Sequence, residues 1–150
     1  MRPLLCLDLE GTLISNAVSQ IPRPGLFQFL EQVAKLCDLM LYTSVSFERV
    51  EGIRNLLVKE DVVPVWFRDI SVIRPDNTHK PKIACGRQDA FLLDDQSGVI
   101  VPGEEDWLVA IPEYLPPYSD NDRALDRALE DIKIRVRLLE PSVRIELKDL

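Results

Sequence analysis

Carboxylate and hydroxyl side chains follow three short apolar runs of this chain, which suits them to metal-assisted chemistry. Asp8 follows the run 4–7, Thr43 follows the run 39–42, and Asp94 with Asp95 follows the run 90–93. Such runs are typical of buried parallel strands, whose carboxyl ends meet along one sheet edge where ligands bind. Carboxylates gathered there repel one another unless a cation lies between them. The pattern therefore predicts a divalent cation, and Mg²⁺ suits a site with few carboxylates best.

Each of these polar residues also has an ordinary structural explanation when it is taken alone. An Asp or Thr after a strand is usually a turn or cap residue, and Asp94-Asp95 before Gln-Ser-Gly is typical of a turn. Recurrence at three strand ends weakens the purely structural interpretation, and so does the hexapeptide that begins at Asp8.

The apolar spacing along the chain predicts strands that alternate with helices. Helical spacing covers 26–36 and 50–57, between the strand-length runs, and further short strands are expected at 99–101 and 107–111. This alternation indicates an α/β fold with a mainly parallel central sheet.

Two segments have less regular patterns. Residues 58–79 predict irregular structure with one or two edge strands, because VVPVWF resembles a short strand interrupted by Pro64. From Ser119 onward, apolar residues at spacings of three and four predict a helix capped by Ser119 or Asp120, although 132–138 also alternates as a strand would.

Composition narrows the class of protein. The 150 residues are 46% hydrophobic and carry a net charge of −7, which fits one globular domain spanning 1–150. Scattered positive charge argues against nucleic-acid binding, and no apolar run is long enough to cross a membrane. Because the N-terminus lacks a secretory signal and the three cysteines are far apart in the sequence, we expect reduced thiols and a cytoplasmic protein.

The hexapeptide Asp8-Leu9-Glu10-Gly11-Thr12-Leu13 resembles the DxDGT(L/V) nucleophile motif of the haloacid dehalogenase superfamily. The block RPGLFQFLEQVAKLCDLMLYTSVS is similar to one found in its NIF/FCP-like phosphatase branch, and HKP, FLLDDQS and VPGEEDW extend the resemblance to about residue 130. The resemblance implies a three-layer Rossmann-like fold and a Mg²⁺-dependent phosphatase.

In such an enzyme Asp8 attacks the phosphoryl group and forms an aspartyl-phosphate, which divides one difficult displacement into two. Gly11 and Thr12 supply a turn whose backbone N–H groups can surround phosphate oxygens, since a small residue lets the main chain approach closely. The resemblance further implies that Thr43 and the amide of Ser44 donate to the same phosphoryl group.

The resemblance also implies the metal ligands and a phosphate-binding lysine. The ion would be held by Asp8, by the backbone carbonyl of Glu10 and by the acidic pair, with Asp95 as direct ligand and Asp94 beside it. Lys80, in His79-Lys80-Pro81, fits the lysine–proline pattern best, and Lys82 remains the alternative. We expect His79 to be a surface or loop residue.

Glu10 departs from the usual motif, which has Asp two residues after the nucleophile as general acid and base. Glutamate has the same proton chemistry with a similar unperturbed pKa, so hydrolysis remains possible. The longer side chain leaves a second hypothesis open, in which a weak or inactive domain uses the cleft for phosphate binding or regulation. Phosphotransfer and dehalogenation are further options, but dehalogenation does not require the acidic pair.

The chain leaves no room for a folded cap over the site. The gap 13–25 is too short, and 58–79 can hold only a small insertion, in which we expect Trp66, Phe67 and Arg68 to border the cleft. An open cleft suits a phosphate on a macromolecule, such as a phosphoserine or phosphothreonine segment, better than a small metabolite that must be enclosed.

Overall fold

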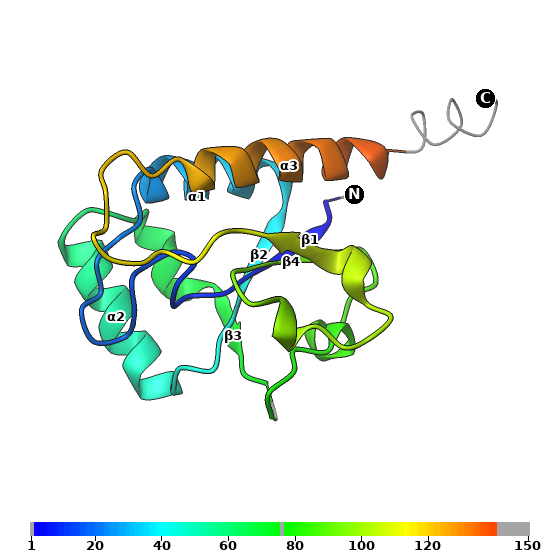
Figure 1. The fold of residues 1–150 in the computed structure, drawn as a ribbon, viewed down its shortest axis with the longest axis horizontal. Helices are drawn as coiled ribbons and strands as arrows, with labels where there is room; N and C mark the ends of the chain where they lie inside the picture. Colours follow the sequence, from blue (N-terminus) through cyan, green and yellow to red (C-terminus); the bar gives the residue numbers. More distant parts are fainter. Residues whose placement is uncertain (1, 76, 141–150) are drawn as a thin grey trace.

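The computed structural model describes residues 2–75 and 77–140, and these form a five-stranded sheet in the order β3-β2-β1-β4-β5 (Figure 1). All of its strand pairs are parallel. The strands are β1 (Leu4–Leu7), β2 (Asp38–Tyr42), β3 (Ser71–Ile73), β4 (Ala90–Asp94) and β5 (Leu108–Ala110). The predicted α/β fold with a mainly parallel sheet is thereby confirmed.

The register of the central strands brings their carboxyl ends together. Leu7 of β1 lies opposite Leu41 of β2 on one side and opposite Leu93 of β4 on the other. Because the next residues along these strands continue in the same direction, the segments that begin at Asp8, Thr43 and Asp94 emerge at one edge of the sheet.

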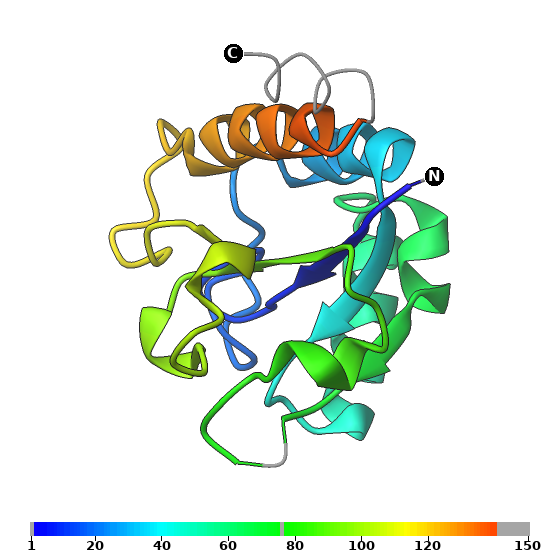
Figure 2. The same cartoon turned by 90° about the vertical axis from the view of Figure 1, so that its right-hand side faces the viewer.

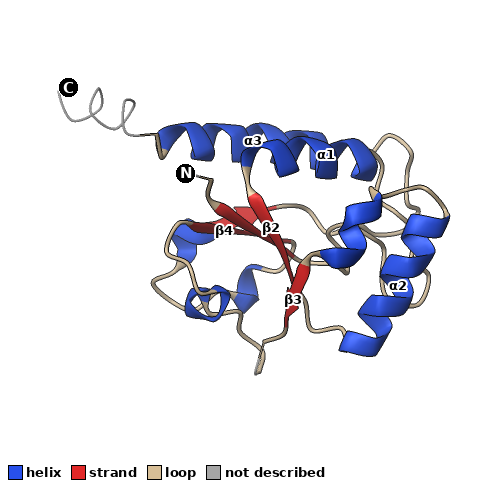
Figure 3. Cartoon of the chain, turned by 180° about the vertical axis from the view of Figure 1, so that it is seen from behind, coloured by secondary structure: helices blue, strands red, loops and turns tan. Residues whose placement is uncertain are grey.

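Three α-helices in the described residues cover one face of the sheet: α1 (Leu26–Leu36), α2 (Phe47–Lys59) and α3 (Ala124–Leu138). Their apolar sides share one core with alternate strand residues, such as Leu5 and Leu7 of β1. Helices α1 and α3 lie side by side along this face (Figures 1 and 3). The predicted helix at the end of the chain is therefore correct, and the alternating pattern over 132–138 does not form a strand.

The opposite face is covered by short 3-10 helices and loops. Leu4 and Cys6 of β1 point to this side and pack with Cys85 and Trp107, which lie in the 3-10 helices Lys82–Cys85 and Glu105–Trp107. Figure 2 shows this third layer in green and yellow-green below the strands, with α1 and α3 above them. The connections on this side are rich in turn residues, which disfavour long helices.

The prediction of an edge strand within 58–79 is confirmed by β3, but a strand at VVPVWF and a strand at 99–101 are not formed. Val65–Asp69 forms a 3-10 helix that begins after Pro64, whose carbonyl accepts from the Phe67 amide at 3.0 Å. The edge strand of this region is instead Ser71–Ile73, and 99–101 follows a 3-10 turn at Ser97–Val99. Proline fixes its own φ and cannot donate to a sheet ladder, which explains why a helical turn replaces the expected strand at Pro64.

The expected cap of α3 at Ser119 or Asp120 is also wrong. The helix begins at Ala124, whose amide donates to the Asp122 carboxylate at 3.0 Å. The apolar spacing locates the helix, but the side chain that caps it depends on where the preceding loop folds.

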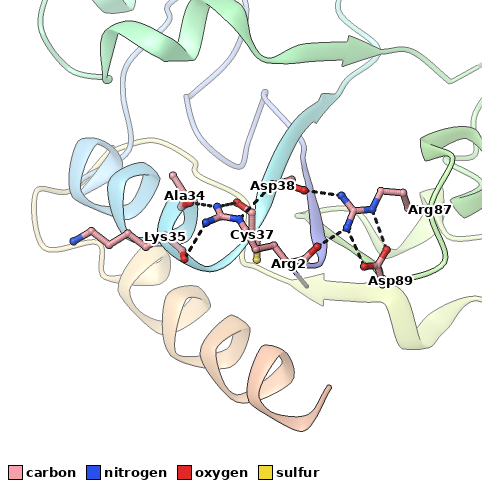
Figure 4. A network of polar contacts seen from close by, with 7 residues as sticks. All are labelled: Arg2, Ala34, Lys35, Cys37, Asp38, Arg87 and Asp89. Carbon is pink, nitrogen blue, oxygen red and sulfur yellow. Dashed lines mark hydrogen bonds and ion pairs between the residues drawn. The ribbon is translucent and has the colours of Figure 1, made fainter. Parts of the chain in front are cut away.

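A network of charged side chains ties the amino ends of the central strands together (Figure 4). The Arg87 guanidinium bonds both Asp89, just before β4, and Asp38, the first residue of β2, and also donates to the carbonyl of Arg2. Arg2 in turn lies 3.3 Å from Asp38 and donates to the carbonyls of Ala34 and Cys37 at the end of α1. The network therefore connects the central strands at their amino ends, whereas Asp8 lies at the carboxyl ends.

The predicted free thiols are confirmed, because Cys6, Cys37 and Cys85 are buried and unpaired by disulfides. In the part of the chain that the structure describes, no helix has the length and apolarity needed to cross a bilayer.

Candidate active site

Asp8 and Lys80 form a buried ion pair at the carboxyl edge of the sheet. The Lys80 ammonium lies 2.9 Å from Asp8 Oδ1 and 2.6 Å from Asp94 Oδ2, and all three residues are buried. Lys80 reaches this position because its amide donates to the carbonyl of Val99 at 2.7 Å, which holds its segment against the loop after β4. Of the two candidate lysines, Lys80 therefore meets the carboxylates, whereas Lys82 lines a separate hollow with Gly86 and Glu104.

Burial shifts the pKa values of the groups that form this contact. Desolvation raises the pKa of Asp8 well above its usual value despite the opposing charge of Lys80, and the nearby Asp94 raises it further. Desolvation likewise raises the pKa of Asp94. Burial alone would lower the pKa of Lys80, but the two carboxylates hold it above its usual value, so the ammonium stays charged.

The acidic pair after β4 completes a cluster of three carboxylates. Asp8, Asp94 and Asp95 each offer an oxygen within 4.8 Å of the other two. Asp94 uses its second oxygen to accept from the Gln96 amide at 2.9 Å, and Asp95 accepts from the Gln96 side chain at 2.8 Å. Residues more than eighty positions apart in sequence thus converge, as the strand-end pattern predicts.

Thr12 links two of the carboxylates through a single hydroxyl. Its Oγ1 lies 2.8 Å from Asp8 Oδ2 and 2.9 Å from Asp95 Oδ1. A hydroxyl carries one proton and can donate to only one of these oxygens, so the other contact requires a carboxyl proton or a cation close by. The Lys80 ammonium bonds only two of the three carboxylates, Asp8 and Asp94, and Asp95 has no cationic partner in the described residues. The donor set therefore fits a divalent cation with oxygen ligands.

Gly11 is needed for close packing at this cluster. Its φ of +75° is one that other residues rarely adopt, and an added Cβ would lie 2.7 Å from Asp95 Oδ2. Its amide donates to the carbonyls of Ile14 and Ser15, at 2.8 and 3.2 Å, and is not available to a ligand. This corrects the expectation that the Gly11 amide surrounds a phosphate: the turn folds back on itself and satisfies that donor.

Other amides of the same loop are unpaired. Within residues 2–75 and 77–140, the structure gives no acceptor for the backbone N–H groups of Leu9 and Glu10, which follow Asp8 directly. Because backbone donors this close to a buried site usually have a partner, their lack of one marks them as candidates for binding an anion. The sequence carries no signal for this role of Leu9, because its side chain is simply part of the core.

Thr43 and Ser44 lie across the cleft from the loop after β1. Thr43 is fully buried and its amide donates to the Ile73 carbonyl at 3.1 Å, while its hydroxyl oxygen accepts from the Val45 amide at 3.1 Å. The hydroxyl proton of Thr43 remains free to donate elsewhere. Ser44 is exposed and lines the cleft.

Glu10 borders the same cleft with its carboxylate held in place. Its Oε2 accepts from the amide of Ala17 at 2.6 Å, and the side chain is half-buried. The longer side chain, compared with the usual Asp, is thus accommodated by a contact with the loop that follows.

A buried arginine, Arg23, hydrogen-bonds to the loop that follows β1. Arg23 donates to the carbonyls of Gly11 and Thr12, at 3.3 and 3.2 Å, and pairs with both oxygens of Asp122 at 3.0 and 3.1 Å. It also lies 5.2 Å from the ring centre of Tyr114, whose amide donates to the Gly11 carbonyl. The sequence carries no signal for Asp122, and the only signal for Arg23 is its position in the RPG block.

The cleft has a volume of about 580 Å³, and exposed side chains form its mouth. Its lining residues include Asp8, Glu10, Gly11, Thr43, Ser44, Asn77, Thr78, Lys80, Asp94, Asp95, Gln96 and Glu113. No separate cap domain covers it in the described residues. Phe67 is fully buried in the core and neither Trp66 nor Arg68 lines the cleft, so the expectation that this segment borders it is wrong. His79 lies half-buried in a loop.

Comparisons with known proteins identify a family and a similar fold. A family model for NLI interacting factor-like phosphatases matches residues 3–144. Among curated proteins no match is found. The chain is similar in structure to Fcp1, an essential RNA polymerase II CTD phosphatase, with a TM-score of 0.53 and 16% identity over 89% of this chain and 50% of that one.

A second similar structure is a variant of the fission yeast RNA polymerase II CTD phosphatase Fcp1 bound to beryllium fluoride. Its TM-score is 0.50 at 16% identity, over 98% of this chain and 54% of that one. The chain thus spans about half the length of these proteins, and at this identity the likeness shows a shared fold.

Proposed function

Since the chain belongs to the NLI interacting factor-like phosphatase family, we propose that it is a Mg²⁺-dependent phosphomonoester hydrolase that works through an aspartyl-phosphate on Asp8. One observation carries the proposal: the Asp8 carboxylate lies between Lys80 and Thr12, within reach of Asp94 and Asp95, in a cleft open to solvent.

The proposed phosphate site combines one cation with several fixed donors. The Lys80 ammonium and the Thr43 hydroxyl provide side-chain donors, and the amides of Leu9, Glu10 and Ser44 provide backbone donors. Such groups meet the negative charge on the phosphoryl oxygens as it is redistributed during transfer, and they need no reorganisation when they are held in advance. Gly11 acts in this proposal by allowing Asp95 to approach closely, and the Thr12 hydroxyl links Asp95 to Asp8. The Thr12 amide, which has no acceptor within the described residues, remains a proposed phosphate donor.

The proposed reaction has two displacements. An Asp8 oxygen attacks phosphorus, the bond to the leaving oxygen breaks, and Glu10 gives that oxygen its proton. Glu10 then takes a proton from a water molecule, whose oxygen attacks the phosphorus of the aspartyl-phosphate and releases Asp8 and inorganic phosphate. The contact between Glu10 and the Ala17 amide fixes the carboxylate at the cleft, where it can serve as acid and then as base.

Asp8, Asp95 and the backbone carbonyl of Glu10 would hold the ion, with Asp94 beside them. When bound, Mg²⁺ supplies positive charge that offsets the repulsion between the carboxylates and the phosphate. Asp94 suits the outer position because its oxygens already accept from Lys80 and from the Gln96 amide.

The proposed substrate is a phosphorylated serine or threonine in a protein segment. The exposed mouth of the cleft supports this, since a polypeptide could lie across it, and the similar structures are of phosphatases that act on the C-terminal domain of RNA polymerase II. The three free thiols fit a reducing compartment, and we place the activity in the cytoplasm.

The test is hydrolysis of a chromogenic aryl phosphate by the wild type and by Asp8→Asn, with Mg²⁺ or with a chelator. We expect Mg²⁺-dependent turnover that falls by about a thousandfold or more in Asp8→Asn. Asp69→Asn, at an exposed position outside the cleft, is the matched control. Equal turnover by the wild type and Asp8→Asn would refute the proposal. Phosphopeptide binding without turnover would favour a phosphate-binding domain instead.

A further inference from the structure

A second hollow of about 480 Å³ adjoins the cleft. It shares Glu10, Asn16 and Ser44 with the cleft, so the two are continuous along these residues. Two arginines form part of its lining: Arg49, in the first turn of α2, and Arg74, just after β3. Both side chains are exposed to solvent.

Neither of these two arginines has a carboxylate partner within the described residues, a property that they share there with Arg68, Arg127 and Arg137. The Arg74 guanidinium donates to the carbonyl of Ser44 at 3.2 Å, which holds it beside the cleft, and the Arg49 guanidinium makes no ion pair there. Six other arginines lie within 4.0 Å of an Asp or Glu oxygen, namely Arg2, Arg23, Arg54, Arg87, Arg123 and Arg135.

Positive charge is therefore concentrated in the second hollow, where Arg49 and Arg74 outnumber the one carboxylate that lines it, Glu10. Lys80 is the only cationic side chain that lines the cleft in the described residues, and it is engaged by Asp8 and Asp94. Glu113 lies at the mouth, where it accepts from Gln96 at 3.0 Å. A substrate with a second negative charge would be repelled on the Glu113 side and attracted on the Arg49 and Arg74 side.

We infer that this second hollow, lined by Arg49 and Arg74, is a subsite for another anionic group of the same substrate, either a carboxylate or a second phosphate close to the scissile one. The inference rests on the proposed function, because that function places the scissile phosphate at Asp8. It assigns a substrate class: phosphorylated segments with acidic or further phosphorylated neighbours.

The size of the effect follows from the exposure of the two side chains. Exposed ion pairs are weak, so we expect each arginine to improve kcat/KM for an acidic substrate by about two- to fivefold. The improvement should shrink as ionic strength rises, because salt screens exposed charges.

The experiment compares phosphoserine peptides that differ only in flanking residues. One carries Glu on the N-terminal side of the phosphoserine and another carries it on the C-terminal side, each with a Gln counterpart, and a doubly phosphorylated peptide separates phosphate from carboxylate. The kcat/KM ratio of each acidic peptide to its neutral counterpart is measured for wild type, Arg49→Gln, Arg74→Gln and the double variant. Arg137→Gln, which removes the same charge from the exposed end of α3, is the control.

We expect the wild type to prefer at least one acidic peptide, the double variant to lose most of that preference and Arg137→Gln to keep it. Ordinary hydrolysis without any preference, or a preference that persists in the double variant, would overturn the subsite and leave the proposed function intact. If the wild type hydrolyses neither the peptides nor the aryl phosphate, the proposed function fails. Fluorescence anisotropy with the same peptides then decides the subsite, and equal affinities for the acidic and neutral peptides would overturn it as well.

Discussion

At the scale of single residues, Lys80 is the group on which the carboxylate cluster depends. Replacing Lys80 by Gln leaves Asp8 and Asp94 without their common cation and removes one donor to the proposed phosphate. We predict that Lys80→Gln lowers kcat/KM for an aryl phosphate by about a hundredfold or more.

Lys82→Gln is the matched control, because this lysine lies two residues away and lines a different hollow. It should retain activity close to that of the wild type. Similar losses in the two variants would show that the ammonium at Asp8 and Asp94 has no special role.

A substitution at Gly11 combines backbone strain with a steric clash, and the same substitution at Gly86 causes the strain alone. Gly11→Ala adds a Cβ beside Asp95 at a positive φ, whereas Gly86→Ala meets the same backbone strain at +78° with nothing within 4 Å. We predict that both lower the free energy of unfolding by about 1–2 kcal/mol, measured by urea denaturation. Only Gly11→Ala should also reduce phosphatase activity and Mg²⁺ affinity. If Gly86→Ala loses as much activity, the contact with Asp95 is not the cause.

At the scale of secondary-structure elements, the Arg87 network joins the starts of β1, β2 and β4 (Figure 4). Hydrogen bonds from Arg87 lower the pKa of Asp38 and of Asp89 below their usual value of 3.8. Their contribution to stability is therefore fully present above pH 3.8 and is lost as pH falls through the lower folded-state values.

We predict that Arg87→Gln is less stable than the wild type in urea at neutral pH, and that the difference shrinks as the pH falls below 3.8. Since these side chains are partly exposed, added salt should reduce the difference at neutral pH. A difference that stays constant into strong acid would mean that Arg87 stabilises the protein by packing alone.

Several secondary-structure elements, and part of the site, could be predicted from the sequence. Strands and helices with a clear apolar period, such as β1 and α1, were predictable because burial of one face dictates their spacing. The convergence of Asp8 with Asp94 and Asp95 was predictable because parallel strands end at one edge.

Features that depend on loop paths were not predictable. Neither the pairing of Arg23 with Asp122, 99 residues apart, nor the helical turn after Pro64 follows from local pattern. The same holds for the Gly11 amide, whose acceptors depend on how the loop folds back. The preference for Lys80 over Lys82 was predictable from the lysine–proline pattern, but the contact between the Lys80 amide and the Val99 carbonyl that holds its segment in place was not.

At the scale of the whole molecule, the carboxylate cluster makes folding sensitive to divalent cations. An ion that binds only the folded state stabilises it by about 2.7 kcal/mol when its concentration is a hundred times its Kd. We predict that Mg²⁺ raises the Tm of the wild type in a concentration-dependent way, and that Asp95→Asn weakens this response. KCl at matched ionic strength is the control. An equal rise in Tm with KCl would attribute the effect to screening of the net charge of −7.

Because the two faces of the sheet are covered differently, we expect parts of the protein to unfold at different denaturant concentrations. One face is held by three α-helices, while the segment that carries Lys80 belongs to the side covered by short turns. Segments with fewer buried contacts open at lower free energy than the rest of a fold. As denaturant is added, catalytic activity should therefore be lost while the helical circular dichroism signal is still native. Inactivation would then occur at a lower denaturant concentration than global unfolding.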